Sequence, residues 1–270
     1  MRSVAPGPAP SFDSVPNFRD AGGLPTVDGG RVRTAVLYRS GHLAGASPAD
    51  LERLVGIGVR VIVDLRRDGD IAVEGENRVP DGARIVRIPI GDVDSTLGVD
   101  VRSLFAAGDV DAIHRAFPPG AAHAMMMRGA RVGVEDELFR MRYASALRAV
   151  VEADGVPTLV NCSAGKDRTG WTVALVLLAV GVDREDVVAE YLRSNDAARP
   201  EPPRAAAVPV GLDRSRLEPL FGVRAEYIEN AFAAAEEGWG SMDAFLEQGA
   251  GLRDTDRQRL RDALVDPAAP

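Results

Sequence analysis

The segment that decides the fold is VNCSAGKDRTG, residues 160–170. An apolar, β-branched run precedes it and predicts a strand over Thr158–Cys162. The residues that follow, Thr169–Val180, are apolar nearly all round and predict a helix packed in the centre of a domain. A strand, a tight loop and a helix N-terminus direct successive backbone N–H groups at one point, where they bind an anion. The segment therefore predicts an α/β unit with an anion site at its turn.

The residue types in this loop fit a tetrahedral phosphate. The three residues after the cysteine are small, so the main chain can curl closely around such a group. Arg168 lies six residues after Cys162, where it can return to the loop centre and offer a bidentate fork to two oxygens. The predicted phosphate cradle comprises Cys162, Ser163, Ala164, Gly165, Lys166, Asp167 and Arg168.

The same electrostatics predict that Cys162 is a nucleophile. A free thiol has a pKa near ~8.5, and a helix N-terminus with nearby cations lowers it by several units. Lys166 and Arg168 would be those cations. Thr169 would donate a hydrogen bond to the sulfur and ease its departure as a leaving group.

The placement of Lys166 is a further clue. The chain has 32 basic residues, of which Lys166 is the only lysine, and it lies four positions after the only cysteine, Cys162. Chance placement of two rare residues is the alternative, but their neighbours favour a functional pairing.

The rest of the chain predicts an α/β fold with a mostly parallel sheet, because strand and helix signals alternate. Buried strands are expected at Ala35–Tyr38, Val59–Asp64, Arg84–Ile90 and Thr158–Cys162. Helices are expected after the N-cap Ser47, over Glu135–Asp154, Thr169–Val180 and Asp183–Asn195, and in short pieces over Val223–Val265. In Glu135–Asp154 the apolar positions include Leu138, Met141, Leu147 and Val151.

We expect one phosphate-handling domain over residues 11–266, after a Pro/Ala-rich flexible tail at 1–10. The segment Asp92–Arg131 interrupts the alternation of elements, and with the next helix it predicts a lid-like insertion over about 92–145. Its methionine run, Met125 to Met127, is typical of core filling more often than of a substrate contact. Residues 197–217 are rich in Pro and Arg and predict a loop.

Composition excludes several classes of protein. A formal charge of −8 and a pI near 5.0 argue against nucleic-acid binding. The longest apolar stretch, Val173–Val182, is too short for an integral membrane segment. A single cysteine forms no internal disulfide, which fits a reducing, cytoplasmic compartment. Secretion without a signal peptide is left open. His114 and His123 suggest no metal set, and no cofactor is expected.

The spacing C-x5-R followed by Thr169-Gly170 resembles the protein tyrosine phosphatase superfamily. More narrowly, CSAGKDRTG is similar to the bacterial tyrosine phosphatases of the secreted mycobacterial B type. Further matching segments are Asn17–Asp20 with Gly22-Gly23, Tyr38–Ser40, Asp64–Arg66, Tyr191–Asn195 and Gly222–Tyr227. The resemblance covers nearly the whole chain, without the tail and the two interruptions.

This resemblance implies a three-layer α/β fold, a helical lid and a two-step reaction through a cysteinyl-phosphate. It implies phosphotyrosine substrates, with phosphoserine/threonine or phosphoinositides as further classes. One position departs from the family pattern, because Asn161 stands where a histidine usually precedes the cysteine. An amide still donates hydrogen bonds to loop carbonyls, so we expect retuning more than loss of activity. A catalytically weak phosphate-binding module remains the alternative.

Three carboxylates are candidates for the general acid that protonates the leaving oxygen. Asp64 ends one predicted strand and Asp92 follows another, and the carboxyl ends of such strands gather on the binding face of a parallel sheet. The alternatives are a salt bridge between Asp64 and a neighbouring Arg, and a loop turn at Asp92. Asp167 lies within the loop between two cations, which favour its ionised form. The family pattern nevertheless places an Asp at that position, so Asp167 ranks first, Asp64 second and Asp92 third.

Lys166 has two interpretations that the sequence leaves open. A second cation in the loop resembles phosphatases that act on polyanionic inositol head groups, where extra phosphates need extra charge. The alternative is that it only reinforces the thiolate of Cys162. A sulfurtransferase that carries a persulfide on Cys162 also fits a lone cysteine in a cradle, but the cationic run suits phosphate better.

Overall fold

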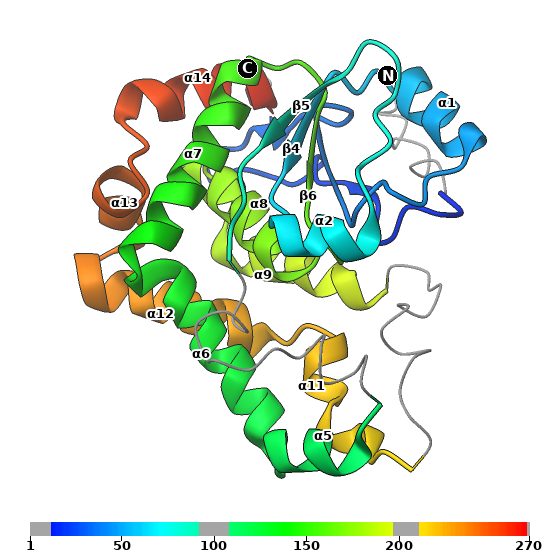
Figure 1. Ribbon diagram of the computed structural model, residues 1–270. Helices are drawn as coiled ribbons and strands as arrows, with labels where there is room; N and C mark the ends of the chain where they lie inside the picture. Colours follow the sequence, from blue (N-terminus) through cyan, green and yellow to red (C-terminus); the bar gives the residue numbers. More distant parts are fainter. Residues whose placement is uncertain (1–11, 92–107, 197–210, 269–270) are drawn as a thin grey trace.

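The structure is a computed structural model that describes residues 12–91, 108–196 and 211–268. Its centre is a five-stranded sheet in the order β1-β3-β6-β4-β5. The strands are β1 (Arg19–Asp20), β3 (Leu37–Ser40), β6 (Thr158–Asn161), β4 (Val61–Asp64) and β5 (Arg84–Arg87). All neighbours are parallel except β1, which runs antiparallel to β3. The predicted α/β fold with a mostly parallel sheet is confirmed (Figure 1).

Helices surround this sheet and continue below it (Figure 1). The longer ones are α1 (Pro48–Gly56), α6 (Ala121–Glu135), α7 (Glu137–Ala153), α8 (Asp167–Ala179), α9 (Arg184–Leu192), α12 (Ala225–Trp239) and α14 (Asp254–Leu264). Shorter ones are α2 (Asp68–Glu74), α5 (Val110–Ala116), α11 (Glu218–Phe221) and α13 (Met242–Ala244). Short turns of other helix types cover Arg193–Asn195, Arg214–Arg216 and Phe245–Gly249, and β2 (Arg31–Val32) pairs with β7 (Val265–Asp266).

The alternation of side chains along the strands produces two hydrophobic cores, one on each face of the sheet. On β4, Val61 and Val63 face the larger core, which α7, α8 and α12 complete. Ile62 points the other way, into a smaller core shared with Leu54 of α1. This arrangement of helix, sheet and helix is the expected three-layer architecture.

Several predicted boundaries shift for local reasons. The strand expected from Ala35 begins at Leu37, because Ala35 has a φ of 63° and its N–H donates to Asp20. The helix expected over Glu135–Asp154 begins at Glu137, with Asp136 as its N-cap, since α6 extends to Glu135. Ser47 caps α1 as predicted.

The apolar positions expected in that helix divide into two groups. Leu147 and Val151 of α7 are buried in the larger core, as predicted. Leu138 and Met141 are each 59% exposed, although they are among the apolar positions of this helix. They lie near the start of α7, on the helix face turned away from the core.

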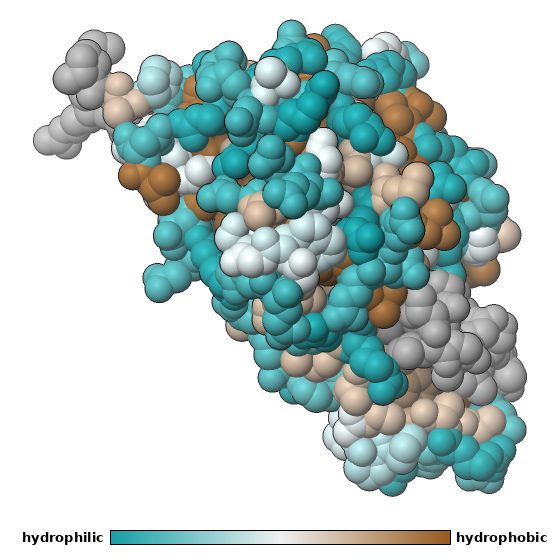
Figure 2. Space-filling model, turned by 90° about the vertical axis from the view of Figure 1, so that its left-hand side faces the viewer, coloured by the Kyte–Doolittle hydropathy of each residue, from teal (hydrophilic) through white to brown (hydrophobic). Residues whose placement is uncertain are grey.

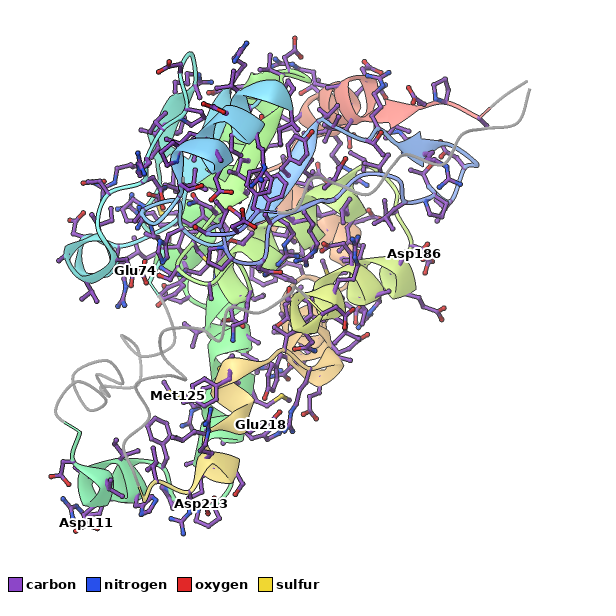
Figure 3. All side chains as sticks on the ribbon, turned by 90° about the vertical axis from the view of Figure 1, so that its right-hand side faces the viewer. Glu74, Asp111, Met125, Asp186, Asp213 and Glu218 are labelled. Atoms are coloured by element: carbon purple, nitrogen blue, oxygen red, sulfur yellow. The ribbon has the colours of Figure 1, made fainter. Side chains whose placement is uncertain are left out.

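An arm formed by α5, α11 and the first half of α6 projects below the sheet (Figure 1). It has a small core of its own, in which Ile113, Phe117 and Met125 pack against Leu212 and Leu217. Figure 3 shows Met125 beside α11. The prediction that the methionine run fills a core is confirmed for Met125. The first part of the expected insertion, and the expected tail, lie outside the described residues.

The surface agrees with the charged composition. In Figure 2 most of the visible face is hydrophilic, and its apolar residues form small separate groups. Among the described residues, no helix combines the length and apolar character that a membrane span requires.

Truncation of Leu54 tests the smaller core. Leu54 is fully buried, whereas the neighbouring Val55 is 40% exposed. We expect Leu54→Ala to lower the free energy of unfolding by about 2 to 5 kcal/mol, because it leaves a cavity against the sheet. Val55→Ala is the matched control and should change stability by no more than about 0.5 kcal/mol. Urea denaturation measures both, and equal losses would contradict this division of α1 into a buried and an exposed face.

Candidate active site

The loop between β6 and α8 lies at the carboxyl edge of the parallel strands. Asn161, the last residue of β6, pairs in register with Ser40 of β3 and with Asp64 of β4. Cys162 follows directly, and α8 begins at Asp167. The unpaired N–H groups of the first turn of α8 therefore lie at the edge where ligands bind in sheets of this kind.

The backbone of the loop is packed tightly against β3. Gly165 has a φ of 69°, and a Cβ there would lie 2.3 Å from the carbonyl carbon of Ser40. Only glycine fits both constraints without displacing the strand. The Gly165 N–H donates to Cys162 Sγ at 3.2 Å, so at least this loop amide faces the sulfur. Cys162 itself is 3% exposed.

Four partners within the described part of the chain hold Arg168 beside the loop. Its Nη1 donates to the Asp70 carboxylate at 2.7 Å and to the carbonyls of Leu65 and Ile90 at 3.3 and 3.2 Å. Its Nη2 donates to Ser163 Oγ at 3.1 Å. Arg168 therefore does return to the loop, and its buried guanidinium is oriented before any anion binds.

Asp70 is the residue of this site that sequence reasoning missed. It is fully buried, and it lies 98 positions before Arg168 in the chain. Its carboxylate also accepts from the N–H of Arg67, which makes it part of the capping box of α2. A capping box in the sequence predicts a helix start, but no local signal would have connected Asp70 with the arginine of the loop.

Asp167 and Lys166 face different surroundings. The side chain of Asp167 is 46% exposed, and its carboxylate lies 4.0 Å from Lys166 Nζ. The Lys166 ammonium donates to the carbonyls of Leu220 at 2.9 Å and Gly222 at 3.3 Å. It therefore connects the phosphate loop to the end of α11, which neither sequence interpretation of this lysine anticipated.

Asp64 is enclosed in a buried ion pair. Its two carboxylate oxygens accept from the guanidinium of Arg66 at 3.0 to 3.3 Å, and one also accepts from Asn77 at 2.9 Å. Both Asp64 and Arg66 are fully buried, and neither lines the pocket at Cys162. The structure thus brings Asp167, and not Asp64, together with the cysteine. Asp92, the third candidate, lies outside the described residues.

Two buried polar groups, one on each side of the loop in the chain, lack partners within the described ranges. The hydroxyl of Thr169 and the side-chain oxygen of Asn161 each have no hydrogen bond. The Asn161 amide donates only weakly, to the Gly41 carbonyl at 3.5 Å. The support that Thr169 would give to the departing sulfur therefore stays a prediction.

A pocket of about 150 Å³ opens in front of the loop. Its floor is formed by loop and α8 residues, including Cys162, Asp167 and Arg168. Its walls come mainly from apolar and aromatic side chains of other helices: Met126, Gly129, Ala130 and Gly133 of α6, Phe139 and Tyr143 of α7, Tyr191 of α9, Leu220 of α11, and Tyr227, Ile228 and Ala231 of α12.

Burial raises the pKa of two wall residues, Tyr191 and Tyr227, the second to about 12. Burial, with the Asp167 carboxylate as the next cause, raises the pKa of Tyr191 well above its usual value. Its phenol therefore stays protonated at any physiological pH.

The helices expected in the lid, α6 and the start of α7, line the same pocket as the predicted cradle.

Comparisons with known proteins show which proteins the chain resembles over most of its length. The family model described as the tyrosine phosphatase family matches residues 10–266. A Cupriavidus necator protein, whose name describes it as a candidate tyrosine-protein phosphatase, is 35% identical over 87% of this chain and 82% of its own length. The triple specificity protein phosphatase PtpB of Mycobacterium tuberculosis is 32% identical over 92% of this chain and 96% of its own length.

Among solved structures, P. aeruginosa TpbA, crystallised in complex with pTyr, matches with a TM-score of 0.35 and 19% identity. That match covers 72% of this chain and 91% of TpbA. The family model and both sequence relatives span most of the chain, cradle included. The chain therefore belongs to the tyrosine phosphatase family.

Proposed function

We propose that this protein hydrolyses phosphomonoesters, phosphotyrosine first, through a cysteinyl-phosphate intermediate. The observation that carries the proposal is that one pocket is lined by Cys162, Asp167 and Arg168. These three side chains supply a nucleophile, a proton donor and an anion-binding fork, which together cover the reaction. The names of both sequence relatives support the same activity.

In the first step the Cys162 thiolate attacks phosphorus and the ester P–O bond breaks. The departing oxygen takes a proton from the Asp167 carboxyl group, which leaves the alcohol neutral. Arg168 and the loop N–H groups bind the three non-bridging oxygens, where negative charge is concentrated in the transition state. Because Asp70 already orients the Arg168 guanidinium, little reorganisation is needed when the phosphate enters.

In the second step the Asp167 carboxylate accepts a proton from water, whose oxygen attacks the phosphorus of the cysteinyl-phosphate. The S–P bond breaks, and the sulfur leaves as a thiolate that the Gly165 N–H and the Thr169 hydroxyl stabilise. Orthophosphate is released, and Asp167 regains the proton that it needs for the next cycle.

The pocket walls support an aromatic ester as the first substrate. The phenyl ring of phosphotyrosine is apolar, and Phe139, Tyr143 and Ile228 line the space beside the cradle. Phosphoserine, phosphothreonine and phosphoinositides form the wider substrate range of the proposal. For phosphoinositides the support is the resemblance of a loop with a second cation to phosphatases that act on inositol head groups. The Lys166 ammonium itself is bound to the carbonyls of Leu220 and Gly222.

Replacement of the nucleophile tests the proposal as a whole. We expect Cys162→Ser to abolish vanadate-sensitive hydrolysis of para-nitrophenyl phosphate at pH 5 to 7, because an alcohol cannot replace the thiolate. Orthophosphate binding, measured by calorimetry, should survive, since Arg168 and the loop amides remain. Acid-quenched wild-type protein should carry substrate phosphate on Cys162. Unchanged turnover in Cys162→Ser would refute the mechanism.

The second candidate is a phosphate-binding module with little turnover. It is favoured by the weak bonding of Asn161, whose side-chain oxygen has no hydrogen-bond partner among the described residues and lies directly before the cysteine. The two candidates differ in one measurement on the wild-type protein. Tight phosphate binding without vanadate-sensitive hydrolysis would support the module, whereas turnover supports the phosphatase.

Asp167→Asn tests the proton donor. We expect turnover of phosphotyrosine to fall by about 10² to 10⁴, the usual contribution of general acid catalysis. The loss should be smaller for para-nitrophenyl phosphate, because its leaving group is more acidic and needs less protonation. Asp111→Asn, an exposed change on α5, is the control and should act like the wild type. Equal losses on both substrates would assign Asp167 another role.

Lys166→Ala tests the substrate range. Since the Lys166 ammonium donates to the carbonyls of Leu220 and Gly222, we expect hydrolysis of phosphotyrosine peptides and of phosphoinositides to fall by similar factors. The kcat/KM values for both substrate classes measure this. A loss confined to phosphoinositides would show instead that the lysine binds the additional phosphates of the inositol head group.

A further inference from the structure

A buried polar cluster lies behind the phosphate loop, on the side away from the pocket. We call it the back cluster, and it comprises Asn17, Arg19, Arg39, Glu190 and Ser194. Arg39 is fully buried, and Glu190, Arg19 and Asn17 are 3, 5 and 8% exposed. None of the five is among the described residues that line the pocket. The cluster therefore cannot touch a substrate in the cradle, and it acts through the loop if it acts at all.

Two members of the back cluster bind the loop through consecutive carbonyls. Asn17 Nδ2 donates to the carbonyl of Gly165 at 2.7 Å and weakly to that of Ala164 at 3.5 Å. Arg39 Nη2 donates to the carbonyl of Gly165 at 2.7 Å and to that of Lys166 at 3.2 Å. Three carbonyls in a row are therefore turned toward the back of the loop.

Because peptide bonds are planar, the direction of these carbonyls also fixes the direction of the N–H groups on the front of the loop. In a planar trans peptide the carbonyl and the following N–H point in opposite directions. With the carbonyls turned back, the N–H groups of Gly165, Lys166 and Asp167 are turned toward the cradle. The Gly165 N–H confirms this direction, because it donates to Cys162 Sγ. The back cluster thus holds the amides where an anion needs them.

Glu190 orients both donors. Its Oε2 accepts from Arg39 Nη1 at 2.6 Å, and its Oε1 accepts from Arg19 Nε at 2.6 Å. Arg19 in turn donates to the side-chain oxygen of Asn17, which leaves the amide nitrogen of Asn17 directed at the loop. Ser194 Oγ accepts from both arginines. The carboxylate of Glu190 is therefore connected to the loop directly through Arg39 and indirectly through Arg19 and Asn17.

The charges of the cluster make this carboxylate hard to replace. Burial and the neighbouring Arg39 lower the pKa of Arg19 to about 10, although Glu190 acts against them. Burial alone would raise the pKa of Glu190, but Arg39 and Arg19 outweigh it and lower the pKa below its usual value. Without the carboxylate, two guanidiniums would remain buried next to each other with their charge uncompensated.

We propose that Glu190 is a positioning residue for phosphate binding, which sets the direction of the loop amides through Arg39 and through the Arg19–Asn17 pair. The proposal rests on the proposed function, since it concerns the same cradle. It assigns a task to the sequence segments around Asn17, Arg39 and Ser194, which lie outside the cradle itself. It also explains why these residues are buried although they are polar.

Glu190→Gln is the decisive variant, because it keeps the shape of the side chain and removes its charge. Two readouts are independent of turnover: the affinity for vanadate by calorimetry, and the rate at which iodoacetamide alkylates Cys162 as a function of pH. We expect vanadate binding to weaken about tenfold or more, the loss typical of disturbing a charge-assisted hydrogen bond. The alkylation profile should shift to higher pH, because fewer amides stabilise the thiolate.

Leu54→Ala serves as a control of comparable instability, because it damages the smaller core and not the loop. It should lower the melting temperature while vanadate affinity and the alkylation profile of the folded protein stay as in the wild type. The same result for Glu190→Gln would overturn the proposal and leave the cluster a purely structural role. If wild-type protein neither binds vanadate nor hydrolyses phosphomonoesters, the proposed function fails instead.

Asn17→Gly covers the case in which Glu190→Gln does not fold. Asn17 has a φ of 55°, a conformation that glycine adopts without strain, so this change removes the donor to the loop and the acceptor of Arg19 while the backbone keeps its conformation. We expect vanadate affinity to fall severalfold with the alkylation profile shifted in the same direction, and Arg39→Lys to show both effects more strongly. Unchanged binding in the folded forms of both variants would contradict the proposal.

Discussion

The position of β6 in the middle of the parallel sheet is the constraint on which the rest of the structure depends. Because β3 and β4 hold it on both sides, the end of β6 is fixed in three dimensions at Asn161. The chain must then turn through the loop and enter α8, whose body is buried in the larger core. Cys162 and Arg168 therefore lie at the two ends of a loop whose position is fixed by β6 on one side and by α8 on the other.

Much of this arrangement could be predicted from the sequence, because the relevant signals are local. Three of these signals are consecutive in the sequence: the apolar run before Cys162, the small residues of the loop and the apolar helix after it. Each predicts its own element, a strand, a tight turn or a buried helix, without information from the rest of the chain. The N-cap at Ser47 was readable for the same reason. The resemblance to a phosphatase family added the reaction, which a strand and a helix alone do not specify.

The parts that could not be predicted depend on contacts between distant segments. Asp70 of α2 accepts from Arg168, which lies 98 positions further along the chain. Asp64, by contrast, is paired with its near neighbour Arg66, the salt bridge that the sequence left open as an alternative. The partner carbonyls of Lys166 come from a segment more than fifty positions further along the chain. Leu138 and Met141 are apolar and nevertheless exposed, because they lie on the face of α7 turned away from the core that buries Leu147 and Val151.

The pocket combines a floor from the loop and the start of α8 with walls from five other helices, two of which, α6 and α11, also contribute to the arm. An inhibitor that fills only the floor would depend on the anion-binding groups and would have to carry a strong negative charge. A compound that extends an aromatic group between Met126 and Ile228 would gain affinity from apolar contact, and it could do so with less charge. The design of selective inhibitors of this protein should therefore start from contacts with the apolar wall residues, and add the anionic group afterwards.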